Sequence, residues 1–188
     1  MVLEGKLVVL REEKLSDMET FVGLRNDLDT QAWSKALPPD YTLPMYQQRF
    51  NEKKFSYDRS SARFTIEHKE TKEIVGTISY DEYEERFSAT IGIVTAKKFW
   101  GQGLAFDAQE TLLKFLFTEL GVRVVRIWTQ SGNIGAVKLA KRSGFKISGR
   151  IRKSTYLHGN IYDNLVADLL REEYFQLHPE LQDNLPAI

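Results

Sequence analysis

Two glycines between a strand-like run and a helix-like run are the residues best spaced for chemistry. The apolar run 91–94 precedes the hexapeptide Trp-Gly-Gln-Gly-Leu-Ala at 100–105, and an amphipathic pattern then continues to about Leu120. Glycine allows close backbone approach to a ligand, and a helix N-terminus offers free N–H groups and a partial positive charge. This order of elements predicts a site for a phosphate-bearing ligand.

The segment that follows supports this interpretation. A β-branched run at 122–129 has the composition of a buried central strand, Asn133 is placed to open a second helix, and Gly144-Phe145 ends it. Other phosphate motifs fit poorly, because the chain has no Gly-x4-Gly-Lys-Ser/Thr and no acidic ribose ligand after a first strand.

Composition restricts the class of protein. The chain has 188 residues, enough for one domain, and 26 Lys plus Arg balance 26 Asp plus Glu, so no net charge attracts nucleic acid or an acidic membrane. Cysteine is absent, which excludes disulfides and thiolate chemistry, and the three histidines (68, 158 and 178) lack metal-ligand spacing. From this histidine spacing we expect no metal site. Residues 1–13 resemble neither a signal peptide nor a membrane span, so we expect a cytoplasmic protein.

The remaining elements must position the glycine turn. Ser16 and Glu19 have the spacing of a capping box, which predicts a helix to about residue 26. We expect one domain over 1–172 and a C-terminal extension over 173–188 that covers a sheet edge or contacts a second copy in a homodimer. Periodicity predicts strands at 6–10, 62–68, 74–80 and 87–94, a turn at 81–86, a helix at 43–55, and a closing hairpin at 145–170 that turns at 158–160.

This order of elements over residues 5–172 resembles the GNAT N-acetyltransferase superfamily. The hexapeptide 100–105 is similar to that family's pyrophosphate loop, Gln/Arg-x-x-Gly-x-Gly/Ala, with Trp100 at the Gln/Arg position. Asn133-Ile134-Gly135-Ala136, Ser143-Gly144-Phe145 and the 158–163 hairpin resemble the branch of ribosomal-protein N-terminal acetyltransferases and their relatives. The resemblance implies an α+β fold with a mixed, mostly antiparallel central sheet flanked by about four helices.

The resemblance also implies acetyl-CoA as co-substrate. The pyrophosphate would bind backbone N–H groups of the glycine turn, the pantetheine arm would pair with the edge of the preceding strand, and Asn133 would contact that arm or merely cap its own helix. Lys138 would meet the 3′-phosphate. The implied cofactor-binding residues are Ile93, Val94, Thr95, Trp100, Gly101, Gln102, Gly103, Leu104, Ala105, Asn133 and Lys138.

For catalysis, the resemblance implies that the N–H of Val94, or of its neighbour, faces the thioester oxygen, a donor of the kind worth about 3 kcal/mol. Glu82 is the candidate to accept a proton from the amine, and Tyr156 the candidate to protonate the thiolate. Trp33, Tyr80 and Glu82 are expected to contact the acceptor.

Three positions that relatives use for catalysis hold other residues here, namely Thr90, Ala136 and Ala140. At pH 7 a lysine-type amine costs about 4.6 kcal/mol to deprotonate and an α-amine about 1.1 kcal/mol. The sequence therefore favours transfer to a peptide N-terminus or an amino sugar. A polyamine or aminoglycoside acetyltransferase, suggested by the acidic run 81–85, and a non-catalytic acyl-CoA-binding module remain alternatives.

Overall fold

The computed structural model describes residues 1–33, 41–54 and 60–184. Its helices are α1 (Met18–Asn26), α2 (Leu43–Lys54), α3 (Leu104–Lys114), α4 (Ile134–Arg142) and α5 (Arg171–Leu177). Its strands are β1 (Val2–Glu4), β2 (Val8–Glu12), β3 (Ala62–His68), β4 (Ile74–Glu84), β5 (Ser88–Thr95), β6 (Val124–Gln130), β7 (Lys146–Leu157) and β8 (Asn160–Leu170). No helix within these residues is long and apolar enough to cross a bilayer.

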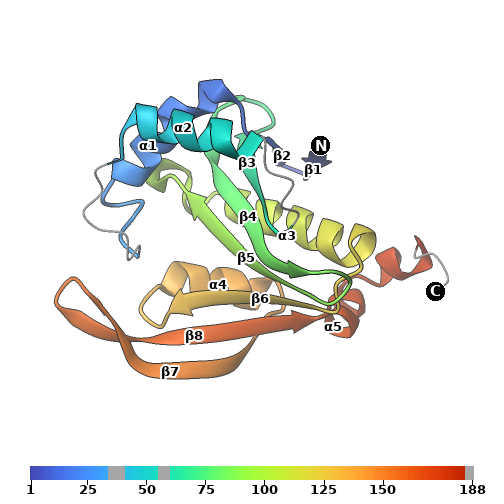
Figure 1. The fold of residues 1–188 in the computed structure, drawn as a ribbon. Coiled ribbons are helices and arrows are strands. Elements are labelled where there is room, and N and C mark those ends of the chain that lie inside the picture. Colours follow the sequence, from blue (N-terminus) through green and yellow to red (C-terminus); the bar gives the residue numbers. More distant parts are fainter. Residues whose placement is uncertain (34–40, 55–59, 185–188) are drawn as a thin grey trace.

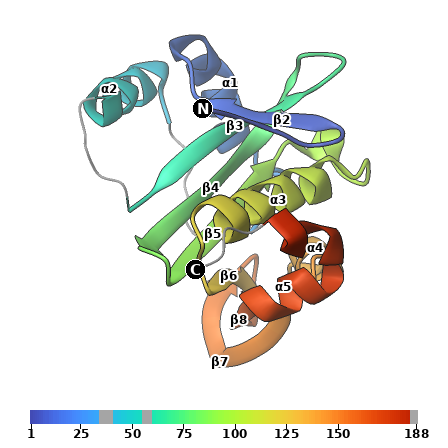
Figure 2. The ribbon, with the colours of Figure 1, turned by 90° about the vertical axis from the view of Figure 1, so that its right-hand side faces the viewer.

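The strands form one sheet in the order β1-β2-β3-β4-β5-β6-β8-β7. All neighbours pair antiparallel except β5 and β6, which are parallel. Helices α1 and α2 cover one face, and α3, α4 and α5 lie on the other (Figures 1 and 2). The expected α+β fold with a mixed, mostly antiparallel sheet is confirmed.

Strands β5 and β6 pair over only a short distance. The paired residues are Ser88–Thr90 with 124–126, and beyond Thr90 the two strands diverge (Figure 1). From Ile91 onward, β5 therefore presents a backbone edge that β6 does not cover. This gap opens toward the glycine turn.

The core lies mainly between the sheet and α3. Ala108, Leu112 and Leu116 form the predicted apolar stripe, and all three are fully buried. Helix α5 adds Tyr174 to the same core, where its ring stacks on Phe117 at a centroid distance of 4.6 Å. The aromatic residues that follow β8 thus pack inside the domain.

Several predicted boundaries were wrong. The N-terminal region forms a hairpin, β1–β2, instead of one strand at 6–10. Ser16 does not cap the first helix: a 3₁₀ turn precedes α1, and the Asp17 carboxylate accepts the Lys14 N–H at 2.8 Å. The predicted turn at 81–86 is shorter, because β4 continues to Glu84 through a bulge in which Glu82 has a φ of 52°.

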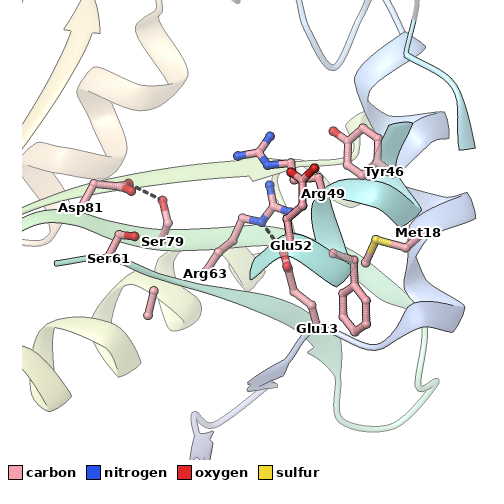
Figure 3. Close-up of a pocket in the computed structure, with 11 residues that line it drawn as sticks. Glu13, Met18, Tyr46, Arg49, Glu52, Ser61, Arg63, Ser79 and Asp81 are labelled. Carbon is pink, nitrogen blue, oxygen red and sulfur yellow. Dashed lines mark hydrogen bonds and ion pairs between the residues drawn. The ribbon is translucent and has the colours of Figure 1, made fainter. Parts of the chain in front are cut away.

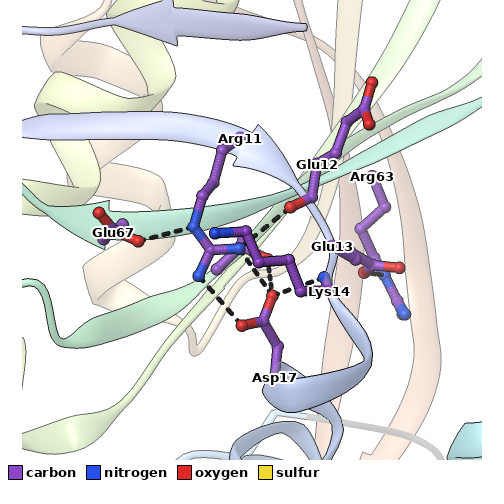
Figure 4. Close-up of polar contacts among 8 residues, drawn as sticks. Arg11, Glu12, Glu13, Lys14, Asp17, Arg63 and Glu67 are labelled. Carbon is purple, nitrogen blue, oxygen red and sulfur yellow. Dashed lines mark hydrogen bonds and ion pairs between the residues drawn. The ribbon is translucent and has the colours of Figure 1, made fainter.

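An ion network centred on Arg11 joins β2, β3 and the turn before α1 (Figure 4). The Arg11 guanidinium donates to both oxygens of Asp17, at 2.7 and 3.0 Å, and its Nε donates to Glu67 at 2.6 Å. The side chains of Arg11 and Asp17 are only 12% and 4% exposed. Thr65 also donates to Asp17, at 3.0 Å, so the carboxylate is fully hydrogen-bonded despite its burial.

The surroundings of Asp17 favour the charged form of its carboxyl group. Burial raises its pKa, but the hydrogen bonds from Arg11 and from the Lys14 N–H lower it by more, so the pKa lies below its ordinary value. A group with a lowered pKa in the folded state stabilises the protein at neutral pH, and this contribution is lost as the pH falls through that lowered pKa.

We expect Asp17→Asn to lower the free energy of unfolding at pH 7 by about 1–3 kcal/mol, the range for losing hydrogen bonds to a charged group. In urea denaturation the difference from the wild type should shrink as the pH approaches 3. Asp29→Asn is the matched control, because Asp29 forms an exposed ion pair with Lys97 and should cost below about 1 kcal/mol. A constant difference across this pH range would contradict the assignment.

Candidate active site

The glycine turn adopts the conformation that its sequence predicts. Gly101 and Gly103 have φ values of 76° and 81°, a region that L-residues with side chains rarely adopt. Gly103 is the N-cap of α3 and has no side chain to accept its first N–H groups. A Cβ atom on Gly101 would meet no atom within 4 Å, so the backbone faces open space there. The geometry suits a phosphate group at this helix N-terminus.

Trp100, at the family's Gln/Arg position, connects the turn to the end of β5. Its indole Nε1 donates to the Thr95 carbonyl at 2.9 Å, while half of the side chain stays exposed. Gln102 donates to the Lys98 carbonyl at 2.8 Å. Both side chains thus hold the turn in place, and its backbone N–H groups remain available to a ligand.

Asp107 is a residue that the sequence analysis missed. It lies in the first turn of α3, is 9% exposed, and accepts the N–H groups of Lys6, Leu7 and Val8 at 2.7–3.0 Å. A Cβ atom on Gly5 would lie 2.4 Å from this carboxylate, so glycine is required for the approach. The bonding partners lie about 100 residues away in the sequence, and no local pattern points to them.

Backbone direction along β5 follows from its pairing with both neighbours. The Ala96 N–H donates to Val75 of β4, and the Phe87 carbonyl accepts from Val124 of β6. The β4–β5 register is continuous from Thr90 to Thr95, so alternation directs the N–H of Val94 toward β4. The N–H groups of Ile93 and Thr95 point into the gap.

Gly76 brings β4 unusually close to β5 beside this gap. A Cβ atom on Gly76 would lie 2.0 Å from the Val94 carbonyl oxygen, which no side chain tolerates. The sequence analysis named Val94 or its neighbour as the donor to the thioester oxygen. In this register the neighbours are the residues with the appropriate direction.

On the other side of the gap, Asn133 caps α4. Its Oδ1 accepts the Ala136 N–H at 3.2 Å, which leaves the Nδ2 donors free for a second partner. Lys138 is exposed on α4. Asn133 thus keeps free amide donors at the start of α4.

Trp33 lies beside the beginning of α4. Its ring contacts Tyr162 of β8 edge to face at 5.1 Å, and a Cβ atom on Gly132 would lie within 2.5 Å of both rings. His158 in the β7–β8 turn is hydrogen-bonded to the Ala32 carbonyl at 2.7 Å. The segment after α1 thus crosses from one side of the gap to the other.

A cavity lies under α1 and α2, on the opposite face of the sheet from α3 (Figure 3). Its outer part has a volume of about 550 Å³ and includes Ser79 and Asp81, and its inner part of about 220 Å³ reaches Thr77 and Val94. The two parts are neighbouring pockets joined by the lining side chains of Tyr46, Arg49 and Arg63, and the one that reaches Val94 of β5 is called the inner part. The inner part therefore reaches the strand that borders the gap. Tyr46 and Phe50 of α2 line the outer part.

The side chains predicted to act in catalysis or to contact the acceptor, Glu82, Tyr80 and Tyr156, lie apart from one another. The exposed Glu82 accepts a hydrogen bond from Thr90 at 2.8 Å, so its carboxylate lies beside the last residue of β5 that pairs with β6. Tyr80 is buried in the core against Tyr83, and burial raises the pKa of its hydroxyl. Tyr156 is 72% exposed on β7. Of the three, Glu82 lies nearest the end of the β5–β6 pairing.

Within residues 1–33, 41–54 and 60–184, no cluster of three His, Asp or Glu side chains is arranged to hold a metal ion.

Comparison with known proteins gives consistent results. A family model described as an acetyltransferase (GNAT) domain matches residues 8–146. An uncharacterized N-acetyltransferase of Bacillus licheniformis, p20, is 29% identical over 120 residues, which span 63% of this chain and 67% of p20.

Solved structures share the fold. The spermidine N-acetyltransferase of Vibrio cholerae, in complex with CoA and spermine, has a TM-score of 0.80 at 22% identity, covering 90% of this chain and 98% of that one. RimL, a ribosomal L7/L12 α-N-protein acetyltransferase in complex with CoA, has a TM-score of 0.78 at 18% identity, with the same coverage of both chains.

We expect Gly101→Ala to weaken acetyl-CoA binding about tenfold or more, because the added methyl group occupies the space where the backbone faces a ligand. Isothermal titration calorimetry measures this effect. Gly121→Ala is the matched control. Gly121 has a φ of 65° and lies at the far end of the α3 segment, so an alanine at this position causes a similar strain of about 1–2 kcal/mol. Equal acetyl-CoA affinity in the two variants would contradict the proposed role of the turn.

Proposed function

Because the chain belongs to the GNAT acetyltransferase family, we propose that it transfers the acetyl group of acetyl-CoA to a primary amine by direct attack in a ternary complex. The observation that carries this proposal is the gap between β5 and β6. The gap has the glycine turn at one end and a cavity for an acceptor on the opposite face of the sheet. Donor and acceptor can therefore approach the same short stretch of β5 from different sides.

Acetyl-CoA supplies the thioester carbon that the amine attacks. A C–N bond forms as the C–S bond breaks, the amine loses one proton, and CoA leaves as a thiolate that takes up a proton. The N–H groups of Ile93 and Thr95 point into the gap, and we assign to one of them the stabilisation of negative charge on the carbonyl oxygen. The N–H groups of 101–105 and the side chains of Asn133 and Lys138 are proposed to bind the rest of the donor.

The acceptor must lose its proton before it attacks, and the chain offers little help with this step. Ala136 and Ala140 occupy positions where relatives carry hydroxyl groups, and Thr90 occupies that of a glutamate. Glu82, which is hydrogen-bonded to Thr90, is the remaining candidate to pass the proton to water. We therefore propose a low-pKa amine, such as a peptide N-terminus or an amino sugar, as the acceptor.

The absence of hydroxyl groups at residues 136 and 140 also favours one alternative, a module that binds acyl-CoA without turnover. Thiol release measured against a Ser-starting peptide, an amino sugar, spermidine and an aminoglycoside tests both functions. Turnover on any amine supports the enzyme, whereas thermal stabilisation by acetyl-CoA without turnover on these amines favours the module. No stabilisation by acetyl-CoA would overturn both.

The pH dependence of kcat/KM should follow the acceptor and not the enzyme. We expect the rate to rise with pH through the pKa of the amine, near 8 for a peptide N-terminus and near 10.4 for a lysine-type amine (approximate values). Comparing pH profiles for two such acceptors measures the shift. An apparent pKa that stays constant between acceptors would show that a group on the enzyme acts as the base.

Asn133→Ser separates the two proposed roles of Asn133. Serine is also a good N-cap, so we expect the free energy of unfolding to change by less than about 0.5 kcal/mol. Removal of the amide donor should nevertheless raise the KM for acetyl-CoA severalfold. If the KM for acetyl-CoA and the free energy of unfolding were both unchanged, Asn133 would act only as a helix cap.

A further inference from the structure

The inner and outer parts of the acceptor cavity differ in charge. In the inner part, which reaches Val94, the ionisable side chains are three arginines and one tyrosine, and no described Asp or Glu lines it. The outer part adds three carboxylates to two of the same arginines. The arginines are Arg25, Arg49 and Arg63, and the carboxylates are Glu13, Glu52 and Asp81.

Two of these arginines have no charged partner among the residues that the structure describes. Arg63 is ion-paired with Glu13, so its charge is balanced. Arg25 donates to the Gln31 side chain at 3.1 Å and to the Tyr41 hydroxyl at 3.0 Å, and both of these acceptors are neutral. Arg49 makes no hydrogen bond or ion pair with any residue in the described ranges. The inner part therefore carries about two uncompensated positive charges.

The carboxylates of the outer part do not cancel these charges. Glu52 accepts from the Gln48 side chain at 2.9 Å, and Asp81 accepts from Ser79 at 2.9 Å. In the close-up, Asp81 and Ser79 lie at one end of the cavity, whereas Glu13 and Glu52 lie with the arginines and Tyr46 toward the other (Figure 3). None of the three carboxylates forms an ion pair with Arg25 or Arg49 among the described residues, so these two cations remain available to a ligand.

The charges of the three arginines all act on Tyr46. Its side chain is 5% exposed and lines both parts of the cavity. Burial raises the pKa of its hydroxyl, and the positive charges of Arg25, Arg63 and Arg49 each oppose that rise. All three guanidinium groups are therefore close enough to act on one buried hydroxyl.

This arrangement suits an anion and repels a cation. A guanidinium group matches carboxylate and phosphoryl oxygens in a bidentate geometry. The same charges disfavour an ammonium ion nearby, which lowers the pKa of the bound amine and favours its neutral, nucleophilic form. In a chain without an evident base, this effect performs part of the work of deprotonation.

We propose that the acceptor is an amine that also carries a carboxylate or phosphoryl group near the amine, and that Arg25 and Arg49 bind this group at the inner end of the cavity. This inference rests on the proposed function and specifies its substrate class. It separates this chain from the structurally similar Vibrio cholerae enzyme, whose complex contains the polycation spermine.

The first experiment compares acceptors that differ only in the anion. Glucosamine 6-phosphate is compared with glucosamine, and the C-terminally amidated peptide Ser-Glu-Ala with Ser-Gln-Ala, so that the two pairs distinguish a phosphoryl from a carboxylate source. We expect kcat/KM for the anionic member of at least one pair to exceed that of its neutral partner about tenfold or more. Spermidine should be the poorest acceptor. Equal rates within both pairs, or a preference for spermidine, would overturn the proposal.

The second experiment tests the arginines. Arg49→Gln should raise the KM for the preferred anionic acceptor about tenfold and change the rate with its neutral partner by a clearly smaller factor. Arg25→Gln should act in the same direction, and its thermal unfolding must be compared because Arg25 also holds Gln31 and Tyr41. Arg152→Gln, at an exposed arginine on β7, is the matched control and should change neither rate. If Arg49→Gln and Arg152→Gln behave alike, the inner arginines do not recognise the acceptor.

The two hypotheses fail in different ways. Absence of thermal stabilisation by acetyl-CoA overturns the proposed function itself. Stabilisation by acetyl-CoA with turnover on spermidine or neutral amines leaves the function intact and overturns the anionic acceptor. A third outcome is that acetyl-CoA stabilises the protein, but calorimetry detects no binding of either anionic probe and neither probe is turned over. This outcome also overturns the anionic acceptor.

Discussion

The incomplete pairing of β5 and β6 is the constraint on which the rest of the structure depends. Backbone N–H and C=O groups inside a sheet need partners, and an uncovered edge within a fold is costly unless something else satisfies it. Here the β5–β6 pairing stops at Thr90. At the far end of the uncovered edge, the Trp100 indole N–H donates a hydrogen bond to the Thr95 carbonyl. The N–H groups between these points are left for a ligand, and the glycine turn begins a few residues further on.

The surrounding elements hold the two diverging strands apart in a fixed way. Asp107 ties the first turn of α3 to the β1–β2 turn, and the Trp33–Tyr162 contact joins the segment after α1 to β8. The Arg11 network fixes the start of α1, which forms one wall of the acceptor cavity. These contacts join parts of the chain that are distant in sequence, so the gap is a property of the whole domain and not of one loop.

Sequence reasoning found what is encoded locally. The glycines at 101 and 103, the apolar stripe of α3 and the helix cap at Asn133 follow from backbone preferences and periodicity. Asp107 and the arginines of the cavity were missed, because their roles depend on partners that tertiary folding brings from other elements. The direction of the Val94 N–H could not be predicted either, because it depends on the strand register. A shift of the register by one residue would reverse that direction. The start of α1 was predicted wrongly, because the Asp17 carboxylate accepts hydrogen bonds from Arg11 as well as from the Lys14 N–H of its own turn.

The bond between Asp107 and the β1–β2 turn also has a consequence for the time course of folding. The partners are about 100 residues apart, so during synthesis the N-terminal hairpin leaves the ribosome long before the carboxylate that fixes its turn. At translation rates of roughly 5–20 residues per second, this delay lasts about 5–20 s. Until then the apolar side chains of β2 have no helix to cover them. The N-terminal hairpin thus reaches its final environment only after α3 has been made, and a chaperone that shields nascent apolar segments would have this interval in which to act.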